Sequence, residues 1–104
     1  MISNAKNHHL YKLARKLAES NAEAEPGIIK VLWFPDDNQV RLVEVLEETV
    51  PVDEEIEAFY FSKTKDFPYV SGIALIRPDE ENRVQLPAGW GSWESAQVVY
   101  DRAA

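Results

Sequence analysis

The sequence of 104 residues contains no cysteine, only four glycines and six prolines, and no long hydrophobic run. Without a thiol the chain can form no disulfide, no cysteine nucleophile and no cysteine-ligated zinc or iron–sulfur site. Its longest apolar run, residues 72–76, is far too short to span a membrane. The polar residues 1–10 offer no apolar stretch for a secretory signal. These absences predict a soluble, cytoplasmic protein with no membrane association.

Positive charge is also scarce, and the formal net charge is −7. Residues 1–20 hold four basic side chains and one acidic one, a net charge of +3, whereas residues 21–104 carry −10. Such an acidic body repels nucleic-acid backbones and anionic membranes. Nucleic-acid binding therefore stays open only as an alternative, through Lys12, Arg15 and Lys16 on the polar side of the first helix. Pairing of these cations with acids of this chain, or of a second copy, is the interpretation we favour.

The usual signatures of catalysis and cofactor binding are missing as well. The four glycines are isolated from one another, so no glycine-rich phosphate loop is present. His8 and His9 are adjacent and would point in different directions on a helix, which prevents them from chelating one metal together. The run 36–38 (Asp-Asp-Asn) lacks the alternating acids and distant glutamate of a calcium loop and suits a hairpin turn. We predict no catalytic residue, no cofactor and no metal site.

The hydrophobic pattern of the first half predicts a helix followed by a β-hairpin. Leu10, Leu13, Ala14 and Leu17 share one face of a helix over residues 4–22, which Pro-Gly at 26–27 ends. Residues 28–34 are rich in β-branched and aromatic side chains, and a similar segment at 40–46 follows the turn.

In the second half, strand character returns at 56–62 and at 69–77. Ser92 is a good N-cap for a short last helix that places Trp93, Ala96 and Tyr100 on one face. The sequence therefore predicts one α+β domain over 1–104, with the order α-β-β-β-β-α. Its sheet has four strands and is mainly antiparallel, with an amphipathic helix at the N-terminus and a short helix at the C-terminus.

Two kinds of residue are candidates for binding another protein. The first is a set of aromatic side chains at turns, which either hold local structure together or form an interface: Trp90, Trp93, Phe67 and Tyr69. The second is a group of acids around Pro51, which either form a solvated edge or attract a basic partner: Glu47, Glu48, Asp53, Glu54 and Glu55. Together they favour a non-enzymatic protein-interaction or regulatory module with an acidic docking surface.

Two alternatives belong to other functional classes. One is a small-ligand-binding protein or a carboxylate-dependent enzyme with its site between helix and sheet. The other is nucleic-acid binding through the basic N-terminal helix. A homodimer is an additional expectation, because open sheets have edges to cover and the uneven charge can pair with itself.

Overall fold

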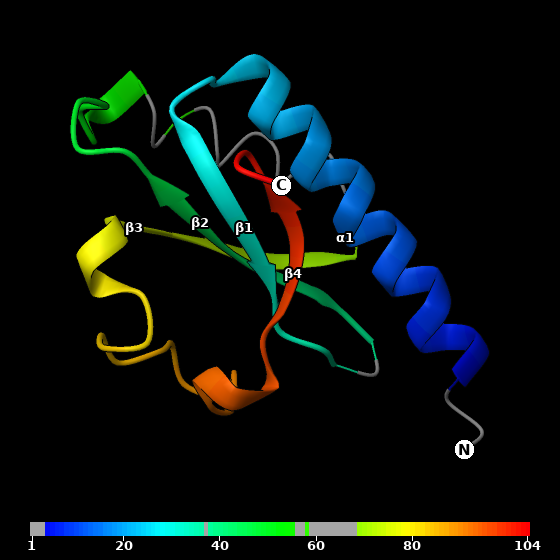
Figure 1. Ribbon diagram of the computed structural model, residues 1–104. Helices are drawn as coiled ribbons and strands as arrows, with labels where there is room; N and C mark the ends of the chain where they lie inside the picture. Colours follow the sequence, from blue (N-terminus) through cyan, green and yellow to red (C-terminus); the bar gives the residue numbers. More distant parts are fainter. Residues whose placement is uncertain (1–3, 37, 56–57, 59–68) are drawn as a thin grey trace.

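A computed structural model describes residues 4–36, 38–55, 58 and 69–104 of the chain (Figure 1). One helix, α1, spans Asn4–Ala24. The four strands are β1 (Ile28–Trp33), β2 (Val40–Leu46), β3 (Val70–Ile76) and β4 (Gln97–Asp101). Single turns of 3-10 helix lie at Pro78–Glu80 and Trp93–Ser95. The α+β class predicted from the sequence is confirmed.

Helix α1 forms where the apolar spacing predicts it, and it runs two residues beyond the predicted end. Leu10, Ala14 and Leu17 are buried against the sheet, as their common face requires. The chain then turns through Gly27, where an added Cβ would overlap the side chain of Val50. Only glycine fits this close approach between the end of the helix and the segment after β2.

Strands β1 and β2 form the predicted antiparallel hairpin, with Trp33 opposite Leu42 at its closed end. In the connection between them, the backbone N–H of Asn38 donates to Oδ2 of Asp36 at 3.2 Å. This local hydrogen bond is typical of the turn chemistry of aspartate. The carboxylate of Asp36 therefore helps to shape the hairpin.

The sheet is mixed, with the strand order β3-β2-β1-β4. Strand β4 pairs with β1 in the antiparallel sense, but β3 lies parallel to β2. The prediction of a mainly antiparallel sheet of consecutive strands is therefore partly wrong. A parallel pair needs a crossover of a dozen or more residues, and the segment 47–69 between β2 and β3 supplies that length. The strand predicted at 56–62 lies, apart from Ala58, outside the described residues.

The predicted C-terminal helix is also wrong. It is reduced to the single 3-10 turn Trp93–Ser95, and the chain continues directly into β4. The run Gln97-Val98-Val99-Tyr100 has the β-branched and aromatic composition of a strand. The free edge of β1 gives this run hydrogen-bonding partners that an isolated short helix would not have.

The sheet carries a different layer on each face (Figure 1). Helix α1 covers one face, where Ile28, Val31 and Val99 join its apolar side chains in one buried cluster. Residues 77–96 cross the other face and pack on a second cluster around Leu32 and Phe34. Among the described residues, no helix is long and apolar enough to cross a membrane.

Candidate functional site

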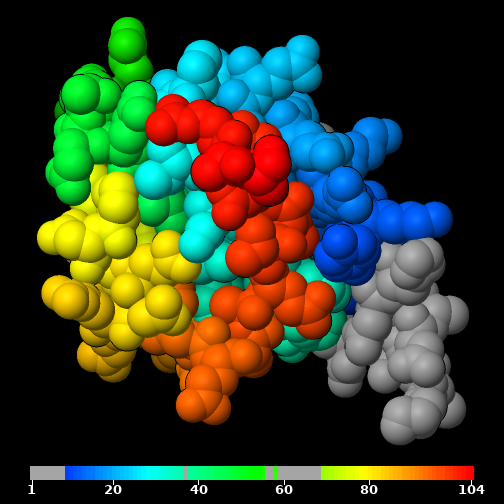
Figure 2. Space-filling model, viewed as in Figure 1, coloured from blue at the N-terminus to red at the C-terminus, as the bar shows by residue number. Residues whose placement is uncertain are grey.

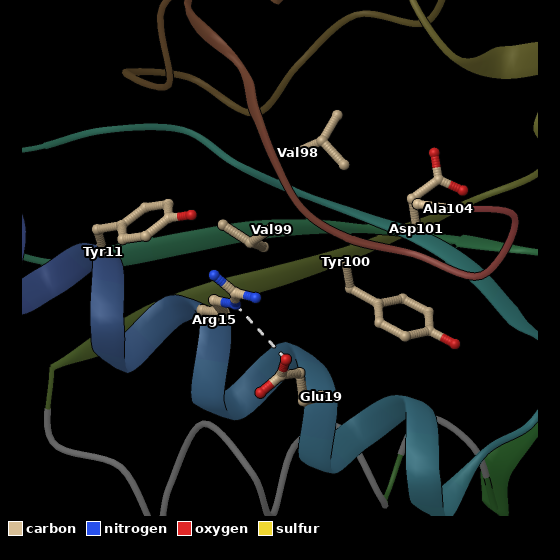
Figure 3. Close-up of a pocket in the computed structure, with 8 residues that line it drawn as sticks. All are labelled: Tyr11, Arg15, Glu19, Val98, Val99, Tyr100, Asp101 and Ala104. Atoms are coloured by element: carbon tan, nitrogen blue, oxygen red, sulfur yellow. Dashed lines mark ion pairs between the residues drawn. The ribbon is translucent and has the colours of Figure 1, made fainter.

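A pocket of about 320 Å³ lies where α1 meets the edge strand β4 (Figure 3). Its position agrees with Figure 2, in which β4 (orange to red) reaches the surface beside α1 (blue). This volume is at the lower end of the range found for small-molecule sites. The residues that line it are Tyr11, Arg15, Glu19, Val98, Val99, Tyr100, Asp101 and Ala104.

The helical wall of the pocket is a stripe of three side chains, Tyr11, Arg15 and Glu19. They are four residues apart, so they stand one above the other along α1. Nε of Arg15 lies 3.5 Å from Oε2 of Glu19, and each side chain is 57 % exposed. An ion pair this exposed contributes little free energy. The guanidinium of Arg15 can therefore turn toward an anionic ligand at small cost.

The strand wall of the pocket is shaped by a β-bulge. Val31 pairs with Tyr100 while Leu32 pairs with Val98, so that Val99 is an extra residue in β4. As a result Val99 and Tyr100 both pack on the α1 side of the sheet, whereas Val98 is half exposed and points away (Figure 3). Bulges re-aim side chains in this way next to functional sites. Here the bulge turns the ring of Tyr100 toward the helix.

Tyr11 packs against Trp33, a core residue that is 2 % exposed. The two ring centroids are 5.6 Å apart with the ring planes at 58°. Tilted aromatic pairs of this kind are favourable beyond the area they bury. The ring of Tyr11 is therefore a pre-positioned wall of the pocket.

The pocket thus combines the guanidinium of Arg15, the carboxylate of Glu19, two phenol rings and an apolar floor at Val99, whereas the carboxylate of Asp101 points away from α1 (Figure 3). Arginine binds planar or phosphate oxygens through two N–H groups at once. Carboxylates accept hydrogen bonds from hydroxyl groups, and tyrosine rings provide flat apolar surface. No group of three His, Asp or Glu side chains suited to a metal ion occurs within the described part of the chain.

A second, smaller pocket of about 250 Å³ lies on the other side of the 101–104 turn. Both of its cationic side chains are already paired. Nζ of Lys30 is 3.0 Å from Glu81, and Nη1 of Arg102 is 3.1 Å from Glu47. The partly buried Lys30 pair is less easily redirected than the exposed Arg15 pair. The α1–β4 pocket is therefore the stronger candidate.

The predicted interaction residues lie elsewhere in the molecule. Trp90 and Trp93 are partly buried on the face opposite α1, with ring centroids 5.9 and 5.6 Å from that of Phe34. Nε1 of Trp93 donates to the carbonyl oxygen of Val84 at 2.8 Å. Both side chains therefore hold residues 84–96 on the sheet. A role for them in binding a partner stays a prediction.

The acidic candidates are spread along the segment that follows β2. Glu47 pairs with Arg102, and the others are exposed: Glu48, Asp53, Glu54 and Glu55. Tyr69 is 55 % exposed, and Phe67 lies outside the described residues. None of the described candidates lines the α1–β4 pocket.

From the sequence, Arg15 was considered for phosphate binding, but the other residues that line the pocket were not predicted. The spacing of Tyr11, Arg15 and Glu19 was a signal available in the sequence, because it defines a polar stripe beside the buried face of α1. No local signal marks Tyr100 and Asp101, since their place depends on a bulge and on pairing with β1.

No family model and no curated protein matches this sequence. Among solved structures, the chain is similar to one described as a "putative nucleotidyltransferase" from Sulfolobus solfataricus. The TM-score is 0.62, and the match covers 99 % of this chain and 90 % of the other at 13 % identity. The likeness is one of fold.

This comparison corrects the function predicted from the sequence. A non-enzymatic interaction or regulatory module with an acidic docking surface conflicts with a fold shared, over nearly the whole chain, with a protein described as a nucleotidyltransferase. At 13 % identity, this likeness is visible in the fold and was not predicted from the sequence.

Proposed function

We propose that this chain binds a nucleotide in the pocket between α1 and β4. The observation that carries the proposal is the joint presence there of a guanidinium, a carboxylate and two tyrosine rings. Each of these groups matches one part of a nucleotide. The similar structure supports the choice of ligand, because a nucleotidyltransferase acts on nucleotides.

The phosphate of the ligand would be bound by Arg15. Its ion pair with Glu19 uses Nε, so both terminal nitrogens remain available for two phosphate oxygens. Charge-assisted hydrogen bonds of this kind are about twice as strong as neutral ones.

The base and the ribose would be held by the remaining side chains. A base can stack on the ring of Tyr11, which Trp33 keeps in position, or on that of Tyr100. Stacking on an aromatic ring contributes about 1–3 kcal/mol per base and tolerates any base. Glu19 offers carboxylate oxygens to the ribose hydroxyls, as acids do in other nucleotide sites.

The test is a titration of the ¹⁵N-labelled protein with AMP, followed by NMR chemical shifts. We expect saturable shifts concentrated on residues 11–19 and 97–101. Arg15→Ala should weaken binding by about tenfold or more, the value of one charge-assisted contact. Lys16→Ala is the matched control, because Lys16 is exposed on the same helix and carries the same charge but does not line the pocket.

Two results would count against the proposal. Shifts that do not saturate, or that lie away from α1 and β4, would show that this pocket is not the site. Equal losses of affinity in Arg15→Ala and Lys16→Ala would show that AMP binding depends only on the overall positive charge of the helix.

A further inference from the structure

The electrostatics of the α1–β4 pocket restrict how many phosphates its ligand can carry. Among the described residues that line it, Arg15 is the single cation, and Glu19 and Asp101 are both acidic. The neighbouring cations of α1, Lys12 and Lys16, are exposed and do not line the pocket. With Arg15, Glu19 and Asp101 ionised, these described lining residues carry a net charge of −1.

The phosphate-binding capacity of Arg15 is limited in the same way. Arg15 carries a single guanidinium, and its Nη1–Nη2 edge is the part that the ion pair with Glu19 does not use. That edge matches two oxygens of one phosphate group. A second or third phosphate would find no further cation among the described lining residues and would lie near the carboxylate of Glu19 instead.

The rest of the molecule adds to this effect at longer range. Residues 21–104 carry a formal charge of −10, and they include β4 and the 101–104 turn at the mouth of the pocket. A field of this sign lowers the local concentration of highly charged anions. Ligands with several phosphates are therefore disfavoured both inside the pocket and on approach to it.

Given the nucleotide binding proposed above, on which this step rests, we infer that the ligand is a nucleoside monophosphate and not a di- or triphosphate. One phosphate satisfies Arg15, while the base and ribose use the tyrosines and the carboxylate of Glu19. The restriction follows from the number of cations in the pocket.

The experiment compares adenosine, AMP, ADP and ATP by the same NMR titration, at constant ionic strength and with EDTA to remove divalent cations. We expect AMP to bind most tightly, with ADP and ATP each about fivefold or more weaker because of the unpaired charge. Adenosine should bind about tenfold more weakly than AMP. In Arg15→Ala the affinity for AMP should fall to that for adenosine, whereas the affinity for adenosine should stay unchanged.

The outcomes separate this inference from the proposed function. If ATP binds as tightly as AMP or more tightly, the protein binds nucleotides but the restriction to one phosphate is wrong. If adenosine binds as well as AMP, Arg15 does not recognise phosphate and the inference is equally overturned. If none of the four ligands binds, the proposed function fails and the inference fails with it.

Discussion

Asn21 and Glu44 are the two polar side chains that the structure buries completely among its described residues. Asn21 lies on α1 and Glu44 on β2, and Nδ2 of Asn21 donates to Oε2 of Glu44 at 2.9 Å. A buried carboxylate is costly unless hydrogen bonds replace the water it loses. This contact therefore fixes how α1 sits on the sheet as well as solvating an acid.

Replacing Asn21 by alanine should lower the free energy of unfolding by about 1–3 kcal/mol, because Glu44 loses a buried donor. Urea unfolding followed by circular dichroism measures the change. Ser20→Ala, next to it but exposed, should stay within about 0.5 kcal/mol of the unmodified protein. Equal stability of Asn21→Ala and Ser20→Ala would show that the hydrogen bond contributes nothing net.

The covering segment 77–96 has little regular structure and is held on the sheet by individual contacts. Arg41 of β2 supplies several of them at once. Its guanidinium donates to three carbonyl oxygens, those of Gly89 at 2.6 Å, Pro35 at 2.8 Å and Phe34 at 3.3 Å. It also lies 5.9 Å from the centre of the Trp90 ring, within the range of a cation–π contact. Arg41 therefore ties the covering segment to the β1–β2 hairpin.

Arg41→Lys should destabilise the protein by about 1–3 kcal/mol although the charge is kept, because an ammonium cannot reproduce three donors in one plane. Chemical denaturation gives the difference in unfolding free energy. The matched change Arg83→Lys, at an exposed position of the same segment, should shift it by less than about 0.5 kcal/mol. If Arg41→Lys lowers the unfolding free energy no more than Arg83→Lys does, Trp90 and Trp93 hold the segment on the sheet without Arg41.

The molecule as a whole carries a net charge of −7, and the described ion pairs offset only part of its internal repulsion. Repulsion among like charges opposes the compact state and is screened by salt. The homodimer expected from the sequence stays a prediction, although β4 and β3 form the two edges of the sheet that such an association would cover.

Stability should therefore rise as sodium chloride increases from about 20 to 200 mM, by less than about 1 kcal/mol, since the charges are mostly exposed. Unfolding curves in urea, which adds no charge of its own, measure this directly. Potassium chloride should give the same result as sodium chloride. A fall in stability over this range would show that attractive ion pairs outweigh the repulsion.

Some elements of the fold could be predicted from the sequence alone, and others could not. The spacing of Leu10, Ala14 and Leu17 was enough to predict α1, and the β-branched run with its turn was enough to predict the β1–β2 hairpin. Both are local signals, because the residues involved are close along the chain. Arg15 was considered for phosphate binding only together with Lys12 and Lys16, as an alternative to their pairing with acids.

Only the tertiary structure decided the elements whose partners are distant. Residues 92–100 carry a helix cap and helical spacing as well as strand composition, and pairing with the free edge of β1 favoured the strand β4. The same pairing produced the bulge that brings Tyr100 into the same pocket as Arg15. The pocket therefore could not be predicted from the sequence. The parallel pairing of β3 with β2 could not be predicted from the sequence either. Local propensities differ by less than about 1 kcal/mol per residue, and burial and hydrogen bonding with distant segments outweigh them.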